Sequence, residues 1–395
     1  MTRRHDADAL AAPSVVEGRV EAVLADGRVA LRLAHATRVF RLAPTIDLVE
    51  GDLVRARVLG ERLDAVLGRA RPRGERPFAD DELRRLSAPS MRAALERRVD
   101  ARRAARATLD ARGFLEVETP SVMINPGMDP HLNAPEVLGF GGPHAMWLGT
   151  SPEFHMKRLL AAGHGRIYQL ARCYRAGERG SRHQPEFTML EWYRSWDSLQ
   201  SVMDDAAALV RAVCDTGDGP VARRHGRSVP LDAPFEALTI REAFARYCPE
   251  VGDPVALAER DEETYYGLLG ERIEPRLGWD GGVFLTRFPA CHASLARLCD
   301  DDPSVCHRAE LYVAGLELCN AFDELTDPEE QRARFEADQR ARAARGLPVH
   351  PIDEPFMRAL ELAMPPSAGN ALGFDRLLML ACGAERIDDV LAFPH

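Results

Sequence analysis

Apolar and polar residues alternate with period two in three short segments that all lie before residue 70. These segments span residues 16–20, 28–33 and 53–58, and the turn sequences at 25–27 and 50–52 separate them. A period of two is typical of strands with one buried face, and Asp-Gly and Gly-Asp pairs favour tight turns. Short alternating strands joined by such turns predict a small closed β-barrel, of the OB or the SH3-like kind.

The charge of this first region is modest, although the whole chain carries a net charge of −10. Residues 1–76 hold 14 arginines and 11 acidic residues, so their net charge is +3 and that of the remainder is −13. Platforms for single-stranded nucleic acid depend on aromatic side chains. Phe40 is the only aromatic residue in residues 1–76. We therefore expect a structural or docking module here, with an RNA-binding module as the alternative.

A charged linker with two prolines and a glycine follows at residues 69–77 (RARPRGERP). It predicts a division into a barrel with its linker, residues 1–76, and a larger domain, residues 77–395. In the larger domain strands and helices alternate irregularly, and no repeat is visible. Its clearest expected elements are a helix at 90–112, a strand at 114–120 and a polar helix with a solvated face at 328–345.

Several classes of protein are excluded by composition. No run of about 18 apolar residues occurs and the first ten residues lack an apolar segment, so we expect neither a membrane span nor secretion, and a cytoplasmic location. The eight cysteines form no CxxC pair, which argues against a zinc site and a disulfide framework. Lys157 is the only lysine. No other lysine can therefore act as a nucleophile or contact a phosphate.

Three separated segments carry residues suited to chemistry. In the first, residues 172–178 lead a strand into a glycine-containing loop, and residues 183–193 form the answering strand. Such a hairpin can clamp a nucleotide, with an arginine on phosphate and an aromatic ring on the base. The second segment, residues 317–324 (ELCNAFDE), is an acidic cluster in an apolar run. The third, residues 369–376 (GNALGFDR), predicts a turn from a strand into a helix.

The spacing inside the acidic segment does not by itself decide its geometry. Seven residues place Glu317 and Glu324 on one face of a helix, but on opposite faces of an unbroken strand. A break of the strand at the step from Asn320 to Ala321 is a further alternative, and the spacing leaves these alternatives open.

Together and in this order, the three segments resemble the motifs of class II aminoacyl-tRNA synthetases. Residues 119–120 match the motif 1 proline at the dimer interface, residues 175–187 match motif 2, and residues 373–376 match motif 3. The words TSPEFHMKRLL, HQPEFTMLEWY, ELCNAFDEL and ARGLPVHPID resemble the lysyl branch. Within that branch, residues 88–395 resemble the truncated paralogues of lysyl-tRNA synthetase that modify elongation factor P. The resemblance implies an α+β fold, an antiparallel sheet flanked by helices, in a homodimer.

The resemblance also implies an ATP site. Arg175 would contact the α-phosphate and Arg376 would lie near the γ-phosphate, while Phe187 would stack on adenine. His183 and Gln184 would lie beside the triphosphate. The other implied ATP-binding residues are Ala176, Gly177, Glu178, Glu317, Leu318 and Gly373. Arg175, Arg376 and Glu317 are the implied catalytic residues.

An amino-acid pocket and a metal site follow from the same resemblance. Glu317 and Glu324 resemble the carboxylates that handle Mg²⁺ and the amino acid. A lysine-type substrate carries two ammonium groups, so its pocket needs carboxylates and a tyrosine hydroxyl. Burying Glu153 and Glu191 without such a ligand would leave charges unpaired, at a cost of several kcal/mol. The implied pocket residues are Ser151, Pro152, Glu153, Glu191, Tyr193, Asn320, Glu324 and Ala371.

The chain departs from the family pattern at a few positions. Motif 2 of the family commonly reads Arg-Asn-Glu, whereas Ala176 and Gly177 separate Arg175 from Glu178 here. The glutamate that usually recognises the adenine amino group is therefore absent or displaced by one residue to Glu178. Gln184 replaces the usual asparagine and Ala321 a glycine. At position 371 the tRNA ligases usually have glycine, while the elongation factor P ligases share the alanine of this chain. The N-terminal barrel is a further departure.

The expected reaction has two steps. ATP, with Mg²⁺, converts (R)-β-lysine or lysine into an aminoacyl-adenylate, and a lysine side chain of elongation factor P then takes the aminoacyl group. No covalent enzyme nucleophile is required. The alternatives are a lysyl-tRNA synthetase, although a tRNA partner is not expected from an aromatic-poor barrel, and a catalytically silent nucleotide-binding regulator.

Overall fold

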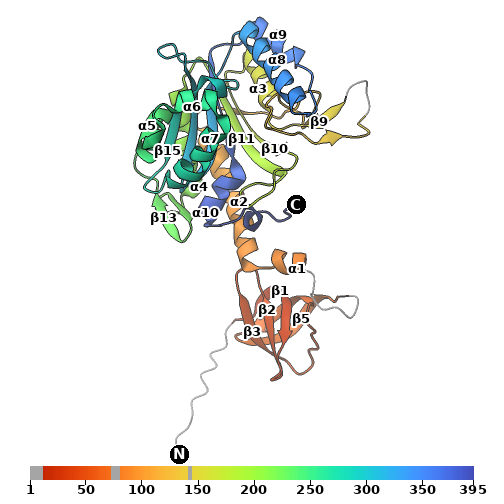
Figure 1. Ribbon diagram of the computed structural model, residues 1–395. Coiled ribbons are helices and arrows are strands. Elements are labelled where there is room, and N and C mark those ends of the chain that lie inside the picture. The colour runs from red at the N-terminus through yellow and green to blue at the C-terminus, as the bar shows by residue number, and fades with distance from the viewer. Residues whose placement is uncertain (1–11, 73–80, 141–144) are drawn as a thin grey trace, which may run out of the picture. The chain divides into compact units, whose positions relative to one another are not determined.

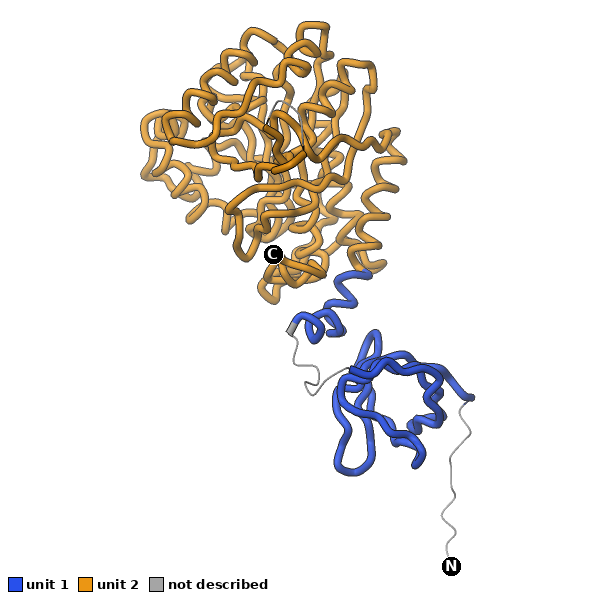
Figure 2. Tube along the Cα trace, turned by 90° about the vertical axis from the view of Figure 1, so that its right-hand side faces the viewer, with its two compact units in different colours: residues 1–96 blue, residues 97–395 orange. Residues whose placement is uncertain are grey.

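The computed structural model describes residues 12–72, 81–140 and 145–395. The chain forms two compact units, residues 1–96 and 97–395, which Figure 2 shows in different colours. The predicted domain boundary between residues 76 and 77 lies outside the described residues and stays a prediction. No helix in the described part of the chain is long and apolar enough to cross a membrane.

A closed five-stranded barrel with the strand order β1-β2-β3-β5-β4 forms most of the first unit (Figure 1). Residues of β4 are alternately exposed and buried along its whole length, as the period-two pattern predicts. Phe40 is buried inside the barrel, so it is not available for stacking at the surface. The five strands and their closure fit the OB alternative. The strands are β1 Ser14–Val23, β2 Arg28–Arg32, β3 Thr37–Leu42, β4 Leu53–Leu59 and β5 Arg62–Ala70.

An eight-stranded sheet with the order β14-β15-β16-β17-β18-β11-β10-β6 is the centre of the second unit. Neighbouring strands are antiparallel except at the two edges, where β14 pairs with β15 and β6 with β10 in parallel. The expected α+β class is confirmed, and the sheet is mixed rather than wholly antiparallel. Its strands are β6 Leu115–Glu116, β10 Arg166–Tyr174, β11 Glu186–Ser195, β14 Glu236–Thr239, β15 Val283–Pro289, β16 Val305–Val313, β17 Leu316–Asp323 and β18 Ser367–Gly373. The short strands β7 Val122–Met123, β8 Glu136–Val137 and β9 Met146–Leu148 form one small sheet, and β12 Val221–Arg224 and β13 Arg227–Pro230 another.

Helices cover the sheet because alternate strand residues are apolar on one face. The helices α4 and α10 pack against that face, where Leu190 and Trp192 of β11 join the largest apolar core. On the other side α3, α8 and α9 share a core with Tyr193. The helices are α1 Asp81–Leu86, α2 Pro89–Asp110, α3 Glu153–Ala161, α4 Leu199–Cys214, α5 Ile240–Tyr247, α6 Pro254–Arg260, α7 Glu262–Leu268, α8 Pro328–Ala344, α9 Glu354–Glu361 and α10 Phe374–Cys382.

Two of the expected elements differ from the sequence prediction in extent or environment. The helix expected at 90–112 is α2, but only β6 remains of the strand expected at 114–120, because just two of its residues pair with β10. The helix expected at 328–345 is α8, which begins after the capping side chain of Asp327. It has the expected solvated face, and it also has a buried side, where Phe335 packs against Phe154.

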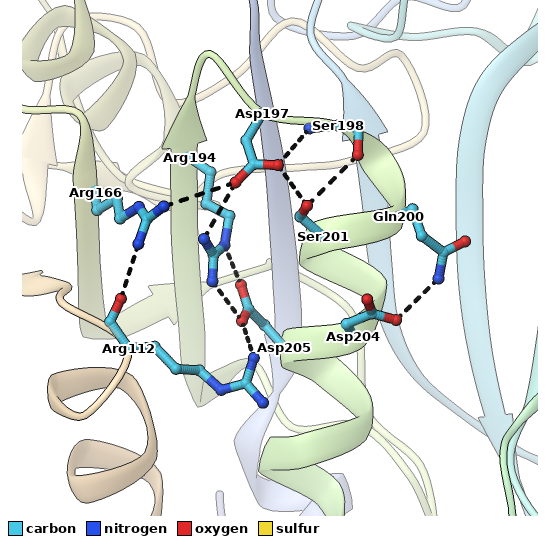
Figure 3. A network of polar contacts seen from close by, with 9 residues as sticks. All are labelled: Arg112, Arg166, Arg194, Asp197, Ser198, Gln200, Ser201, Asp204 and Asp205. Carbon is cyan, nitrogen blue, oxygen red and sulfur yellow. Dashed lines mark hydrogen bonds and ion pairs between the residues drawn. The ribbon is translucent and has the colours of Figure 1, made fainter.

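A buried ion pair fixes β11 to the helix layer (Figure 3). Arg194 donates to both carboxylate oxygens of Asp205 on α4, at 2.6 and 2.8 Å, and Asp205 also accepts from Arg112 at 2.8 Å. A two-pronged guanidinium–carboxylate contact constrains both direction and distance. Successive strand residues point to opposite faces, so the anchored Arg194 orients its neighbour Tyr193 away from α4.

Candidate functional site

One cavity of about 580 Å³ lies over the central strands of the large sheet. Every residue that the sequence places in the site lines this cavity, except Pro152 and Ala176. Pro152 instead caps the start of α3. The backbone N–H of Ala176 donates to the carbonyl of Asn133 at 2.7 Å, which holds the motif 2 loop. The structure thus brings together three segments that are far apart in sequence.

Strand register accounts for the middle of this cavity. Glu191 of β11 lies opposite Ala371 of β18, and Ala371 lies opposite Asn320 of β17. Residues directly opposite each other on neighbouring strands project to the same face. The carboxylate, the methyl group and the amide therefore stand in one row on the cavity floor. Within the described residues, one oxygen of Glu191 and the amide oxygen of Asn320 are buried without a hydrogen-bond partner.

A β-bulge answers the question that the spacing of Glu317 and Glu324 left open. Leu311 of β16 pairs with Cys319, while the next residue, Tyr312, pairs with Glu317, so Leu318 is an extra residue in β17. An extra residue shifts the alternation of all the residues beyond it. Glu317 therefore faces the cavity together with Asn320, and so does Glu324 at the end of β17. The interruption lies at Leu318, and the step from Asn320 to Ala321 expected for it is paired without a break.

At one end of the cavity a lysine lies between two carboxylates. The Nζ atom of Lys157 is 2.6 Å from Oε1 of Glu153 and 2.5 Å from Oε2 of Glu324. Lys157 is completely buried. Burial alone would lower its pKa, but the two carboxylates outweigh this effect and raise the pKa above its usual value. Lys157 therefore stays charged inside the protein.

The carboxyl groups at this end carry more negative charge, when all are ionised, than Lys157 can balance. Burial raises the pKa of Glu191 to about 8, and the charge of Glu153 adds to this effect. Burial likewise raises the pKa of Glu324 to about 8, against the opposing attraction of Lys157. The hydroxyl of Tyr193 donates to Glu191 at 2.5 Å. A cationic ligand would lower both carboxyl pKa values, so this end of the cavity suits an ammonium group.

The other end of the cavity is organised around two arginines. Arg376, at the start of α10, donates to the carboxylate of Glu317 at 3.1 Å and contacts His183. Burial and the charge of Arg376 lower the pKa of His183 to about 4, so the imidazole is neutral. Arg175 lies over the ring of Phe187, with its guanidinium carbon 5.2 Å from the ring centre. Guanidinium groups beside an aromatic ring suit a nucleotide, with charge for its phosphates and a flat surface for its base.

The motif 2 loop differs from the family pattern in a way that the structure explains in part. Gly177 adopts a positive φ of 83°, which glycine accepts without strain. Glu178 lies 3.9 Å from Arg175 and lines the cavity, so a carboxylate is still present one residue later than usual. Gln184 lines the cavity as well, but its amide is held by Asp388 at 2.6 Å and by the backbone of His395 at 3.0 Å.

Two acidic residues near the phosphate end were missed by the sequence analysis. Glu310 of β16 is buried and contacts Arg308 and Tyr312, and its charge interacts with that of Glu317. Glu274 lies 3.2 Å from the Tyr312 hydroxyl. Burial, with the charges of Glu317 and Glu310, raises the pKa of Glu274 to about 7. Glu310 lies opposite Asn320, and the bulge in β17 turns Glu317 to the same face as Asn320. No sequence pattern predicted this bulge.

The metal pair expected from the sequence, Glu317 and Glu324, is not assembled as one group of ligands. Glu324 is occupied by Lys157 at the ammonium end, whereas Glu317 interacts with Arg376 and Glu310 at the phosphate end. Among the described residues, no three His, Cys, Asp or Glu side chains are arranged to hold a metal ion. Mg²⁺ prefers a few carboxylate oxygens together with substrate phosphates. Glu317 with Glu310 fits that preference better than Glu317 with Glu324.

Comparisons with known proteins agree with this geometry. Residues 79–395 match the family described as tRNA synthetases class II (D, K and N). The chain is 45% identical over 295 residues to proteins of Yersinia enterocolitica and Proteus mirabilis named elongation factor P--(R)-beta-lysine ligase, covering 72% of this chain and 89% of each relative. A protein of the same name from Edwardsiella ictaluri is 46% identical over 294 residues, covering 71% and 89%. The chain therefore belongs to the class II tRNA synthetases of the D, K and N group and, within them, to the family of elongation factor P--(R)-beta-lysine ligases.

Proposed function

We propose that this protein is an ATP-dependent ligase that activates (R)-β-lysine and transfers it to a lysine side chain of elongation factor P. The substrate and the acceptor are inferred from the relatives, which are named elongation factor P--(R)-beta-lysine ligases. The observation that carries the proposal is the charge of the amino-acid end. Glu153, Glu191 and Glu324 face a single balancing cation, Lys157, so once a ligand with two ammonium groups displaces the protons of Glu191 and Glu324, two negative charges balance it.

In the first step the carboxylate of the amino acid attacks the α-phosphorus of ATP. The bond from this phosphorus to the bridging oxygen breaks, and pyrophosphate leaves with that electron pair. Arg175 and Arg376 stand where negative charge grows on the phosphate oxygens, and Phe187 offers its face to the base. Such positioned cations, in a site that holds both reactants together, supply most of the acceleration.

Mg²⁺, when bound, would neutralise phosphate charge and orient the triphosphate for in-line attack. We infer that Glu317 and Glu310 hold it. The support is that the charges of Glu310 and Glu317 interact with each other, and that both act on Glu274, whose pKa is raised to about 7 mainly by burial and further by these two neighbours. Arg376 donates to the carboxylate of Glu317 at 3.1 Å and so steadies it.

In the second step the ε-amine of an acceptor lysine attacks the carbonyl carbon of the adenylate. The carbonyl carbon-to-oxygen bond to AMP breaks, AMP leaves, and the amine loses a proton as the amide forms. The amino-acid end meanwhile keeps its hold on the two ammonium groups through Glu191 and Glu324. No side chain of this protein forms a bond to the substrate.

Pyrophosphate exchange and an acceptor assay test the proposal. Exchange of labelled pyrophosphate into ATP should depend on (R)-β-lysine, and a protein without exchange activity would instead be the silent regulator. A lysyl-tRNA synthetase would charge tRNA rather than modify elongation factor P. The buried Phe40 favours a docking or structural role for the barrel over RNA binding. The homodimer with residues 119–120 at its interface and the cytoplasmic location stay predictions.

A further inference from the structure

Lys157 is a fully buried lysine that pairs with two carboxylates from different elements. It follows Glu153 by one turn of α3 and reaches Glu324 at the end of β17, so it joins a helix to the sheet through two contacts of 2.6 and 2.5 Å. Its apolar neighbours on the helix, Met156 and Leu160, are buried in the core. An ammonium group in such surroundings is retained only where its partners are fixed.

Glu324 is confined from its second side as well. A side chain at Gly369 of β18 would collide with a carboxylate oxygen of Glu324 and with the ring of Tyr193. The glycine backbone therefore lies directly against both groups. Glu324 is clamped between Lys157 and this strand, while its neighbours Glu153 and Tyr193 line the same cavity. These contacts fix the position at which the carboxylate of Glu324 can bind an ammonium group of the substrate.

The charge count at this end gives Lys157 a role toward the substrate. When a diamino acid is bound and all three carboxylates are ionised, they and the lysine carry a net charge of −2, which matches the two ammonium groups of the ligand. Without the lysine the same pocket would carry −3, and one carboxylate would have to keep a proton. Lys157 thus adjusts the charge of the pocket to that of a ligand with two positive charges. Lys157 itself does not line the cavity.

We infer that Lys157 is a positioning residue for amino-acid specificity: it serves as a built-in counter-cation that fixes Glu153 and Glu324 for the two ammonium groups of the substrate. The inference deepens the proposed function and rests on it. A residue with this role acts on the amino acid and leaves the nucleotide end unaffected. That separation distinguishes it from a lysine that only supports the fold.

The test is steady-state pyrophosphate exchange with Lys157→Met, in which the KM values for (R)-β-lysine and for ATP are measured separately. We expect the KM for (R)-β-lysine to rise about 100-fold, as for a buried pair that loses one partner. The KM for ATP should change less than about threefold, and selectivity for (R)-β-lysine over 3-aminohexanoic acid, which lacks the second ammonium group, should collapse. Arg158→Met is the matched control, because it removes a cation from the next position of α3 that does not line the cavity.

Lys157→Arg keeps the test decisive if the methionine variant does not fold. It preserves the positive charge, so we expect a KM for (R)-β-lysine within about tenfold of the wild-type value and an unchanged KM for ATP. Equal increases in both KM values, or an unchanged KM and selectivity in Lys157→Met, would overturn the inference. A wild-type protein that does not respond to (R)-β-lysine would instead refute the proposed function, so the two failures are distinguishable.

Discussion

The barrel and the catalytic unit handle charge in opposite ways. In the barrel most ion pairs lie at the surface, such as Arg28 with Asp26 and Arg57 with Asp64, and exposed pairs of this kind contribute about 0–1 kcal/mol each. In the catalytic unit Lys157, Glu191 and Glu324 are all buried within one cavity. Burying charge is costly, and Arg194 with Asp205 or the barrel's Asp52 with Arg71 are balanced by a partner, whereas carboxyl groups buried in excess of their cations point to a ligand that completes the charge balance. Buried charge therefore locates the chemistry in the larger unit.

The largest effect is expected from the phosphate end of the cavity. Arg175→Ala removes a cation from the place where the transition state develops negative charge, and should lower pyrophosphate exchange by about 100- to 1000-fold. Arg172→Ala is the control, since Arg172 is exposed on β10 and pairs with Glu186 at 3.2 Å outside the cavity. Circular dichroism should show both variants folded. Near-normal exchange in Arg175→Ala would contradict the assignment of the motif 2 arginine to the reacting phosphate.

A smaller effect is expected from the cavity floor. Ala371 stands between Glu191 and Asn320, and we expect its methyl group to narrow the space for an α-amino group. One methyl group in a pocket changes discrimination by about 1–3 kcal/mol. We expect the wild type to prefer (R)-β-lysine in adenylate formation, and Ala371→Gly to gain at least about tenfold toward L-α-lysine. A wild type that prefers L-α-lysine, with a preference that does not change in Ala371→Gly, would contradict this role of Ala371.

The raised carboxyl pKa values predict a pH dependence confined to the amino-acid end. Because the pKa values of Glu191 and Glu324 are about 8 in the free protein, protons occupy these groups below that pH and must leave when an ammonium group binds. The KM for (R)-β-lysine should therefore fall about tenfold between pH 7 and pH 8.5, while the KM for ATP stays nearly constant. The free protein should also lose stability over the same rise, because ionising a carboxyl whose folded-state pKa is raised is unfavourable. A KM for (R)-β-lysine and a stability that both stay constant over this range would show that the pocket is ionised already at neutral pH.

The sequence predicted the barrel better than it predicted the details of the site. Alternation along β4 is a local property, so the pattern and the structure agree there. The site residues were identified from long sequence segments that resemble the family. Which of these residues lie opposite each other was not predicted, because that depends on the register between strands. The bulge at Leu318 and the placement of Glu310 arise between strands and leave no local signal. Lys157 was visible as the only lysine, yet its two partners come from segments more than 160 residues apart, Glu153 and Glu324.

The smallest effect on adenylate formation is expected from the barrel. The part of each curated relative that lies outside its match is too short to hold a barrel of this size, and those relatives carry the ligase name. A chain beginning at Arg85 should therefore retain pyrophosphate exchange within about twofold, as expected when the catalytic unit has its own core and carries the whole site. Transfer to elongation factor P, measured in parallel, reports whether the barrel docks the acceptor. Loss of exchange in a folded truncated protein would mean that the barrel completes the active site.

The central claim is that the buried charges of the catalytic unit serve the transfer of a diamino acid to a protein. The most direct measurement incubates the full chain with ATP, Mg²⁺ and labelled (R)-β-lysine, and offers elongation factor P and bulk tRNA as acceptors in separate reactions. We predict label in a stable amide on elongation factor P, shown by an increase in its intact mass, and none on tRNA. Label on tRNA with none on elongation factor P would contradict the account and identify the chain as a tRNA ligase.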